Sequence, residues 1–132
     1  MKNLAAITGV ALVALALAAA AGAGSTTAST SWAGQTPTTG QTLNVTFGIS
    51  SFAPVVPYEY AVQNTCAYPK GHFTLGQRDD IVAWTDTDPV FGKPQVTMPV
   101  YLQSVPAGAS CKVSLVTKNT VVKGSAKSYT VG

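Results

Sequence analysis

The chain has 132 residues, of which 8 are Lys or Arg and 5 are Asp or Glu, and its formal net charge is +3. Charged residues make up only 10% of the sequence, whereas an ordinary soluble domain has roughly 25%. The length excludes large catalytic folds such as the eight-stranded α/β barrel, which needs about 250 residues. The chain is therefore long enough for one domain at most.

Residues 1–23 have the pattern of a secretory signal peptide. Lys2 gives a positive start, an apolar run follows from Leu4 to Ala21, and small residues up to Ala23 fit a cleavage site. The alternative is an uncleaved membrane anchor, since about 18 apolar residues approach a bilayer span. Much of the run is Ala, however, and no Lys/Arg cluster follows it. We expect cleavage after Ala23, and a secreted or cell-surface protein without membrane contact once the signal is removed.

The two cysteines of an exported chain meet an oxidising compartment, so Cys66 and Cys111 are predicted to form a disulfide. In the chain-entropy model a bond closing a loop of this size is worth roughly 4 kcal/mol. A zinc site is not favoured, because two cysteines without clustered histidines do not supply four ligands.

Residues 24–41 are rich in Ser and Thr, and Trp32 is their only large apolar side chain. This composition buries too little apolar surface to offset the entropy of ordering, so we expect a flexible arm. Trp32 either packs back onto the domain or anchors a partner. The folded domain is expected to comprise residues 42–132.

From residue 42 onward, apolar and polar residues alternate with the period of a β-strand. Val and Thr, which favour strands, are abundant, while good helix formers are scarce. Pro- and Gly-containing turn signals separate the runs. About seven short strands in such a length predict a single antiparallel β-sandwich, with a small barrel as the alternative. The runs are 43–49, 58–62, 81–84, 96–105, 111–115, 121–122 and 129–131.

The order Cys66, Trp84, Cys111 is similar to that of immunoglobulin-like cores, in which a Trp packs on a disulfide between the two sheets. The resemblance implies an immunoglobulin-like sandwich in which the bond joins the sheets and Trp84 lies against it.

The sequence has few side chains that could catalyse a reaction. His72 is its only histidine and Arg78 its only arginine, and the common nucleophile, zinc and phosphate-loop motifs are absent. We therefore predict that the protein is not an enzyme and has no cofactor.

Four acidic residues, Asp79, Asp80, Asp86 and Asp88, flank one short run and are weak candidates for a calcium site. Calcium takes six to eight oxygen ligands, several of them carboxylates. The EF-hand pattern is absent, and Asp residues also cap turns and keep loops solvated. The prediction is that these residues hold no metal.

Charge is divided along the chain. All 5 acidic residues lie in 59–88, whereas 93–127 carries lysines without an acid. Neighbouring strands could neutralise each other, or the two regions could form complementary poles that favour contact between copies. Scattered lysines make a poor nucleic-acid surface.

Two classes of function fit these features. The favoured one is a structural or assembly role, as a subunit of an extracellular fibre, pilus or surface layer. In this role an extended strand completes the sheet of a neighbour through backbone hydrogen bonds, and alternate side chains set its register. The residues of this predicted assembly strand are Leu43, Val45, Phe47 and Ile49.

The alternative function is a monomeric extracellular binding module for a carbohydrate or a protein. Aromatic faces pack against sugar rings, and tyrosine adds a hydroxyl. The candidate binding aromatics are Tyr58, Tyr60 and Tyr68, whereas Phe73 and Trp84 are expected in the core. The predicted partners are thus copies of the chain, another protein or a surface polysaccharide.

Overall fold

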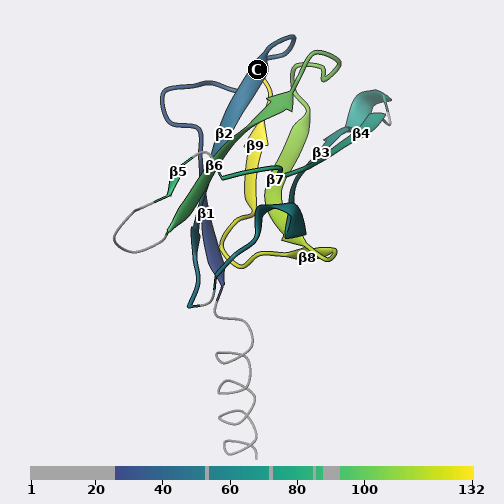
Figure 1. The fold of residues 1–132 in the computed structure, drawn as a ribbon. Helices are drawn as coiled ribbons and strands as arrows, with labels where there is room; N and C mark the ends of the chain where they lie inside the picture. The colour runs from purple at the N-terminus through teal and green to yellow at the C-terminus, as the bar shows by residue number, and fades with distance from the viewer. Residues whose placement is uncertain (1–25, 53, 72, 85, 88–92) are drawn as a thin grey trace, which may run out of the picture.

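The structure of the chain is all-β, in agreement with its abundance of strand-favouring residues. The computed structural model describes residues 26–132 except 53, 72, 85 and 88–92. These residues form two antiparallel sheets and two short 3₁₀ turns (Figure 1). Within them, no helix is long and apolar enough to cross a lipid bilayer.

The strands follow one another in the order β1 (Thr27–Ser31), β2 (Thr42–Ser50), β3 (Tyr60–Tyr68), β4 (Phe73–Asp80), β5 (Asp86–Thr87), β6 (Pro94–Tyr101), β7 (Ser110–Thr117), β8 (Thr120–Val121) and β9 (Lys127–Thr130). The 3₁₀ turns η1 (Pro57–Glu59) and η2 (Pro69–Gly71) precede β3 and β4. One sheet has the order β1-β2-β6-β5. The other has the order β4-β3-β7-β8, and β9 also pairs with β7.

The core lies between the two sheets. Leu43, Val45, Phe47 and Ile49 on β2 are at most 2% exposed, so every second residue of this strand faces inward. Residues of the other sheet complete the same apolar cluster, among them Val62, Val113 and Leu115. The predicted packing of two antiparallel sheets is confirmed, and within the described residues the sheets do not close into the alternative barrel.

The edge strand β1 lies inside residues 24–41, where the composition predicted a flexible arm. It pairs with β2 over its whole length, from Thr27 opposite Ser50 to Ser31 opposite Thr46. Ala28 is its one buried residue. Backbone hydrogen bonds, more than apolar burial, therefore attach this strand, and paired structure begins earlier than the predicted boundary at residue 42.

The predicted disulfide between Cys66 and Cys111 is confirmed. Its expected position between the sheets is wrong, because Cys66 lies directly opposite Cys111 in the antiparallel pair of β3 and β7. The two Cα atoms are 4.0 Å apart. The bond therefore links neighbouring strands of one sheet, on the face that is turned toward the core.

Trp84 does not take the place next to the disulfide that the resemblance implied. Its ring lies 5.7 Å from that of Tyr60, at the start of β3, and its Nε1–H donates to the carbonyl oxygen of Val55. Tyr60 is six residues from Cys66 along the strand, which is about 20 Å at ~3.3 Å per residue. Trp84 closes one end of the core, and the disulfide lies toward the other.

The position of the disulfide in the central pair of the larger sheet predicts a measurable stability effect. Replacing both cysteines (Cys66→Ser with Cys111→Ser) should lower the free energy of unfolding by about 4 kcal/mol, because the unfolded chain regains the entropy of an open loop. Urea unfolding under non-reducing conditions measures this loss. Adding a reductant should destabilise the original protein and leave the variant unchanged, and equal stability of the two oxidised proteins would contradict the prediction.

Candidate functional site

The predicted assembly strand is an interior strand of its sheet. β2 lies between β1, which pairs with residues 46–50, and β6, which pairs with residues 42–48. Its four apolar side chains form part of the core. Pairing β2 with another molecule would require β1 or β6 to leave, so candidate sites must be sought at the outer edges of the sheets.

The part of β2 that β1 leaves unpaired is covered by a side chain. The amide of Gln35 accepts a hydrogen bond from the backbone N–H of Asn44 at 2.9 Å and donates one to the carbonyl oxygen of Asn44 at 2.8 Å. A primary amide has the same donor and acceptor groups as a peptide unit. Gln35 thus takes the place of a neighbouring strand at this position.

A second glutamine covers the outer edge of β6, which the short strand β5 pairs only at residues 94–95. Gln77, on β4 of the other sheet, donates through Nε2 to the carbonyl oxygen of Pro99 at 3.0 Å. Its Oε1 accepts from the backbone N–H of Tyr101 at 2.9 Å. The side chain therefore joins the two sheets and occupies backbone groups near the end of β6.

The outer edge of β1 is covered by the segment that leads into β9. The N–H of Ala28 donates to the carbonyl oxygen of Lys123 at 2.9 Å, and the hydroxyl of Thr30 donates to the carbonyl oxygen of Ser125. Gly124 permits this approach. It has a φ of +85°, and a Cβ at this position would lie 2.7 Å from the carbonyl oxygen of Ala28.

The outer edge of β4 is the longest one without a comparable cover among the described residues. β9, which pairs only with β7, also lies at an edge but has four residues. β4 pairs with β3 from Ala61–Asp80 to Tyr68–Phe73 and is the last strand of its sheet. In the described part of the chain, no other segment forms backbone hydrogen bonds with it. The β3–β4 hairpin reaches away from the rest of the sandwich (Figure 1). No described segment therefore covers this eight-residue strand edge, which is the kind of edge that another strand can pair with.

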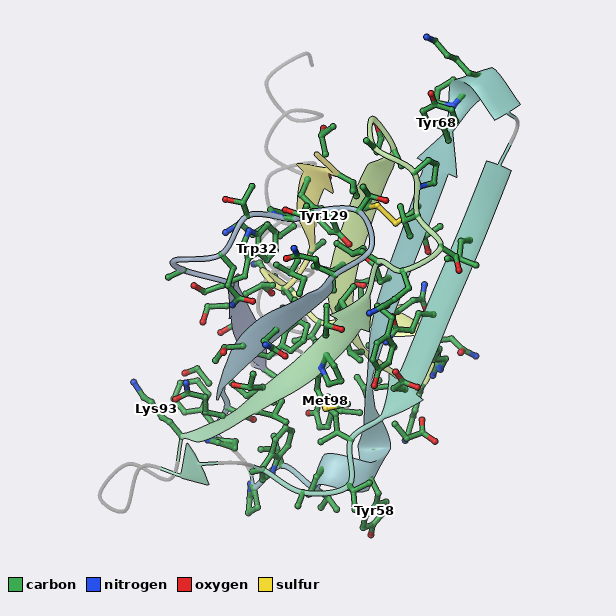
Figure 2. The ribbon with its side chains drawn as sticks, turned by 90° about the horizontal axis from the view of Figure 1, so that it is seen from above. Trp32, Tyr58, Tyr68, Lys93, Met98 and Tyr129 are labelled. Atoms are coloured by element: carbon green, nitrogen blue, oxygen red, sulfur yellow. A yellow bond between two sulfur atoms is a disulfide. The ribbon has the colours of Figure 1, made fainter. Side chains whose placement is uncertain are left out.

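The three candidate tyrosines do not form one surface. Tyr58 in η1 is exposed, whereas Tyr60 is buried two residues later. Burial raises the pKa of Tyr60, a hydrogen bond with Thr26 lowers it, and the charge of Glu59 raises it. Tyr68 lies at the far end of β3, beside Gly108 (Figure 2). These three side chains therefore do not form a single aromatic surface on which a sugar ring could pack.

The four aspartates are also separated. Asp79 and Asp80 are consecutive in β4, so their side chains point to opposite faces of the strand. Asp79 accepts a hydrogen bond from Nε2 of Gln77 at 2.6 Å. The side chain of Asp86 and all of Asp88 lie outside the described residues, as do the side chain of Phe73 and all of His72. Among the residues that are described, no three His, Cys, Asp or Glu side chains could hold a metal ion.

A chain of contacts that the sequence did not predict connects Trp32 with the disulfide. The rings of Trp32 and Tyr129 meet edge to face, with centroids 5.3 Å apart, and Nζ of Lys127 lies 4.2 Å from the centroid of the Trp32 ring. The hydroxyl of Tyr129 donates to Oδ1 of Asn64 at 2.6 Å, and Nδ2 of Asn64 donates to Sγ of Cys66 at 3.4 Å. Trp32 thus packs back onto its own domain (Figure 2).

Comparisons of the chain with protein-family models, curated proteins and solved structures find no match in any of the three. Its function is therefore argued from the geometry of the sheet edges and surfaces described above.

The close contact at Gly124 predicts a specific sensitivity of the β1 edge. Gly124→Ala should lower the free energy of unfolding by roughly 2–4 kcal/mol, because the methyl group meets the Ala28 carbonyl oxygen and the backbone is left-handed there. Hydrogen exchange at the Ala28 amide should accelerate. Gly76→Ala is the matched control, since a Cβ there has nothing within 4 Å, and an equal effect of both substitutions would refute this account.

The environment of Tyr129 predicts a loss of stability at alkaline pH. Burial raises the pKa of Tyr129 from 10.0 to about 12, although its hydrogen bond with Asn64 lowers it. The unfolded chain therefore releases this proton first, so the stabilisation is complete below pH 10 and is lost as the pH rises toward about 12. Urea unfolding over this range, together with tyrosinate absorbance, measures the effect.

Tyr129→Phe should reduce this alkaline loss, and Tyr60 should supply part of what remains because burial raises its pKa as well. Tyr58→Phe changes an exposed side chain and serves as the control. An alkaline loss that is the same in Tyr129→Phe and in the original protein would show that Tyr129 is not its source.

Proposed function

We propose that the protein is an exported, non-enzymatic β-sandwich that assembles with copies of itself through the outer edge of β4. The observation that carries the proposal is the difference between the edges. The edge of β2 is covered by Gln35, that of β6 by Gln77, and that of β1 by the segment at Gly124. The outer edge of β4 has no such cover among the described residues. An uncovered edge is a template for strand addition.

The residues of β4 support this assignment. Charged side chains commonly protect strand edges from pairing. In β4 they are confined to its last three residues, Arg78, Asp79 and Asp80, and the stretch from Phe73 to Gln77 has none. Thr74 and Gly76 are exposed. A second β4 strand would meet these backbone groups without displacing any neighbour that the described residues provide.

Export is supported by the signal-like residues 1–23 and by the disulfide, since such bonds persist in oxidising compartments. The strand order also supports an immunoglobulin-like sandwich, with β2 beside β6 in one sheet and β3, β7 and β9 in the other. A domain of this kind could serve as a subunit of a fibre, pilus, surface layer or adhesive contact.

Lysines placed on the β4 edge test the proposal. The double variant Thr74→Lys/Gly76→Lys should dissociate at least about tenfold more readily than the original protein, because like charges oppose each other across the paired strands. Sedimentation velocity over a concentration series measures this dissociation. Both positions are exposed, and nothing lies within 4 Å of a Cβ at Gly76. The midpoint of thermal unfolding should therefore be the same in the variant and in the original protein.

The matched control adds the same charge away from the edge. Ser104→Lys/Ala107→Lys changes two exposed residues of the connection between β6 and β7 and should assemble like the original protein. The β4 edge would be excluded as the contact if the original protein were monomeric at every concentration, or if both lysine variants dissociated equally.

A further inference from the structure

Large apolar side chains are exposed unevenly over the surface. Phe52 is 95% exposed, Val82 88%, Tyr58 76% and Val121 50%. Phe52, Tyr58 and Val82 lie outside the strands, and Val121 is the last residue of the two-residue strand β8. The remaining exposed side chain of this kind in the described residues is Tyr101, which is 51% exposed.

The strand registers place these four residues at the same end of the sandwich. β1 begins opposite the end of β2, and Tyr60 at the start of β3 is opposite Thr117 at the end of β7. Phe52 follows β2, Tyr58 precedes β3, Val82 follows β4, and Val121 lies in the hairpin after β7. We call this end, where β1 begins, the N-proximal end.

Contacts between the connections hold the N-proximal end together. The hydroxyls of Thr26 and Ser51 are 2.9 Å apart, and Thr26 also hydrogen-bonds the side chain of Tyr60. The N–H of Ile81 donates to the carbonyl oxygen of Tyr60 at 3.0 Å. Tyr101 belongs to the opposite end, since it pairs with Thr42 at the start of β2. Four of the five exposed large apolar side chains of the described residues thus lie at the end where the described chain begins.

The sequence that precedes Thr26 indicates what this end meets. Residues 4–21 form the apolar run, and only residues 22–25 separate it from the first described residue. Four residues span at most ~14 Å when fully extended. A bilayer that holds the apolar run therefore lies within reach of Phe52, Tyr58, Val82 and Val121.

The charges at this end do not favour a particular lipid headgroup. Both signs are present there. The acidic residues are Glu59, Asp79 and Asp80, and the basic ones are Arg78, Lys93, Lys118 and Lys123. Aromatic and aliphatic side chains without a basic cluster are suited to the boundary between headgroups and acyl chains, and they need no anionic lipid. The chemistry matches a lipid surface more closely than a charged partner.

We infer that the N-proximal end of the sandwich lies against a lipid bilayer, with Phe52, Tyr58, Val82 and Val121 in the headgroup region. This differs from the expectation that the exported chain has no membrane contact. While residues 1–23 remain attached they keep this end beside the bilayer, and after their removal the four side chains alone give a weak, reversible contact.

The test uses the full chain in nanodiscs of phosphatidylcholine that contain a lipid with a paramagnetic headgroup. Amide signals of residues 52, 58, 82 and 121 should broaden several-fold more than those of residues 68, 101 and 104, at the other end. Equal broadening of the two ends, or a chain that does not associate with the nanodiscs, would overturn the inference.

Two variants separate docking from simple tethering. Phe52→Ser/Tyr58→Ser/Val82→Ser should lose most of the excess broadening at residues 59, 81 and 121, because the domain lifts from the surface while its N-terminus stays in place. Tyr101→Ser removes an aromatic ring from the opposite end and should keep the excess. Equal broadening in both variants would show that the apolar side chains do not hold the domain there.

A second copy is the competing occupant of this end. Mixing isotope-labelled chains with unlabelled chains that carry a spin label near residue 121 detects it. Broadening between copies at residues 52, 58 and 82, without broadening from the lipid, would replace the bilayer by a second chain. Thr74→Lys/Gly76→Lys should keep the lipid broadening, so failure of the β4 contact can be told apart from failure of this inference.

Discussion

The backbone hydrogen-bonding groups at the sheet edges constrain this small sandwich more than any single side chain does. Neither sheet closes on itself over the residues that the structure describes, so each outer strand has a row of N–H and C=O groups that need partners. Several of these edge groups form hydrogen bonds with other parts of the chain. Gln35 and Gln77 supply amides, and the left-handed Gly124 lets another backbone segment approach β1. The outer edge of β4 lacks such hydrogen bonds among the described residues, and this difference makes it the candidate contact between copies.

The parts of the fold that depend on local alternation were predictable from the sequence. The run from Leu43 to Ile49 indicated a strand with one buried face, and the structure places these side chains in the core. The pairing of Cys66 with Cys111 followed from counting cysteines. The sequence did not predict that both cysteines lie in the same sheet. Tertiary pairing decides which strands are neighbours, and β3 and β7 are far apart in the sequence.

The features that bear on function were less predictable. β1 has little apolar pattern, since Ala28 is its one buried residue, and composition alone therefore assigned it to an arm. Tyr58 and Tyr60 are alike in sequence, yet one ends in solvent and the other in the core because η1 turns the chain between them. The two glutamine contacts join residues that only the folded sandwich brings together.

The two proposals together constrain how copies can be arranged. The strands run between the N-proximal end and the opposite end, so the β4 edge faces sideways from a domain that rests on a bilayer. Antiparallel pairing of two β4 strands reverses one copy, and the two N-proximal ends then point in opposite directions. Parallel pairing keeps both ends on the same side. The direction of β4 pairing therefore decides whether assembled copies form a layer on one membrane or connect two membranes that face each other.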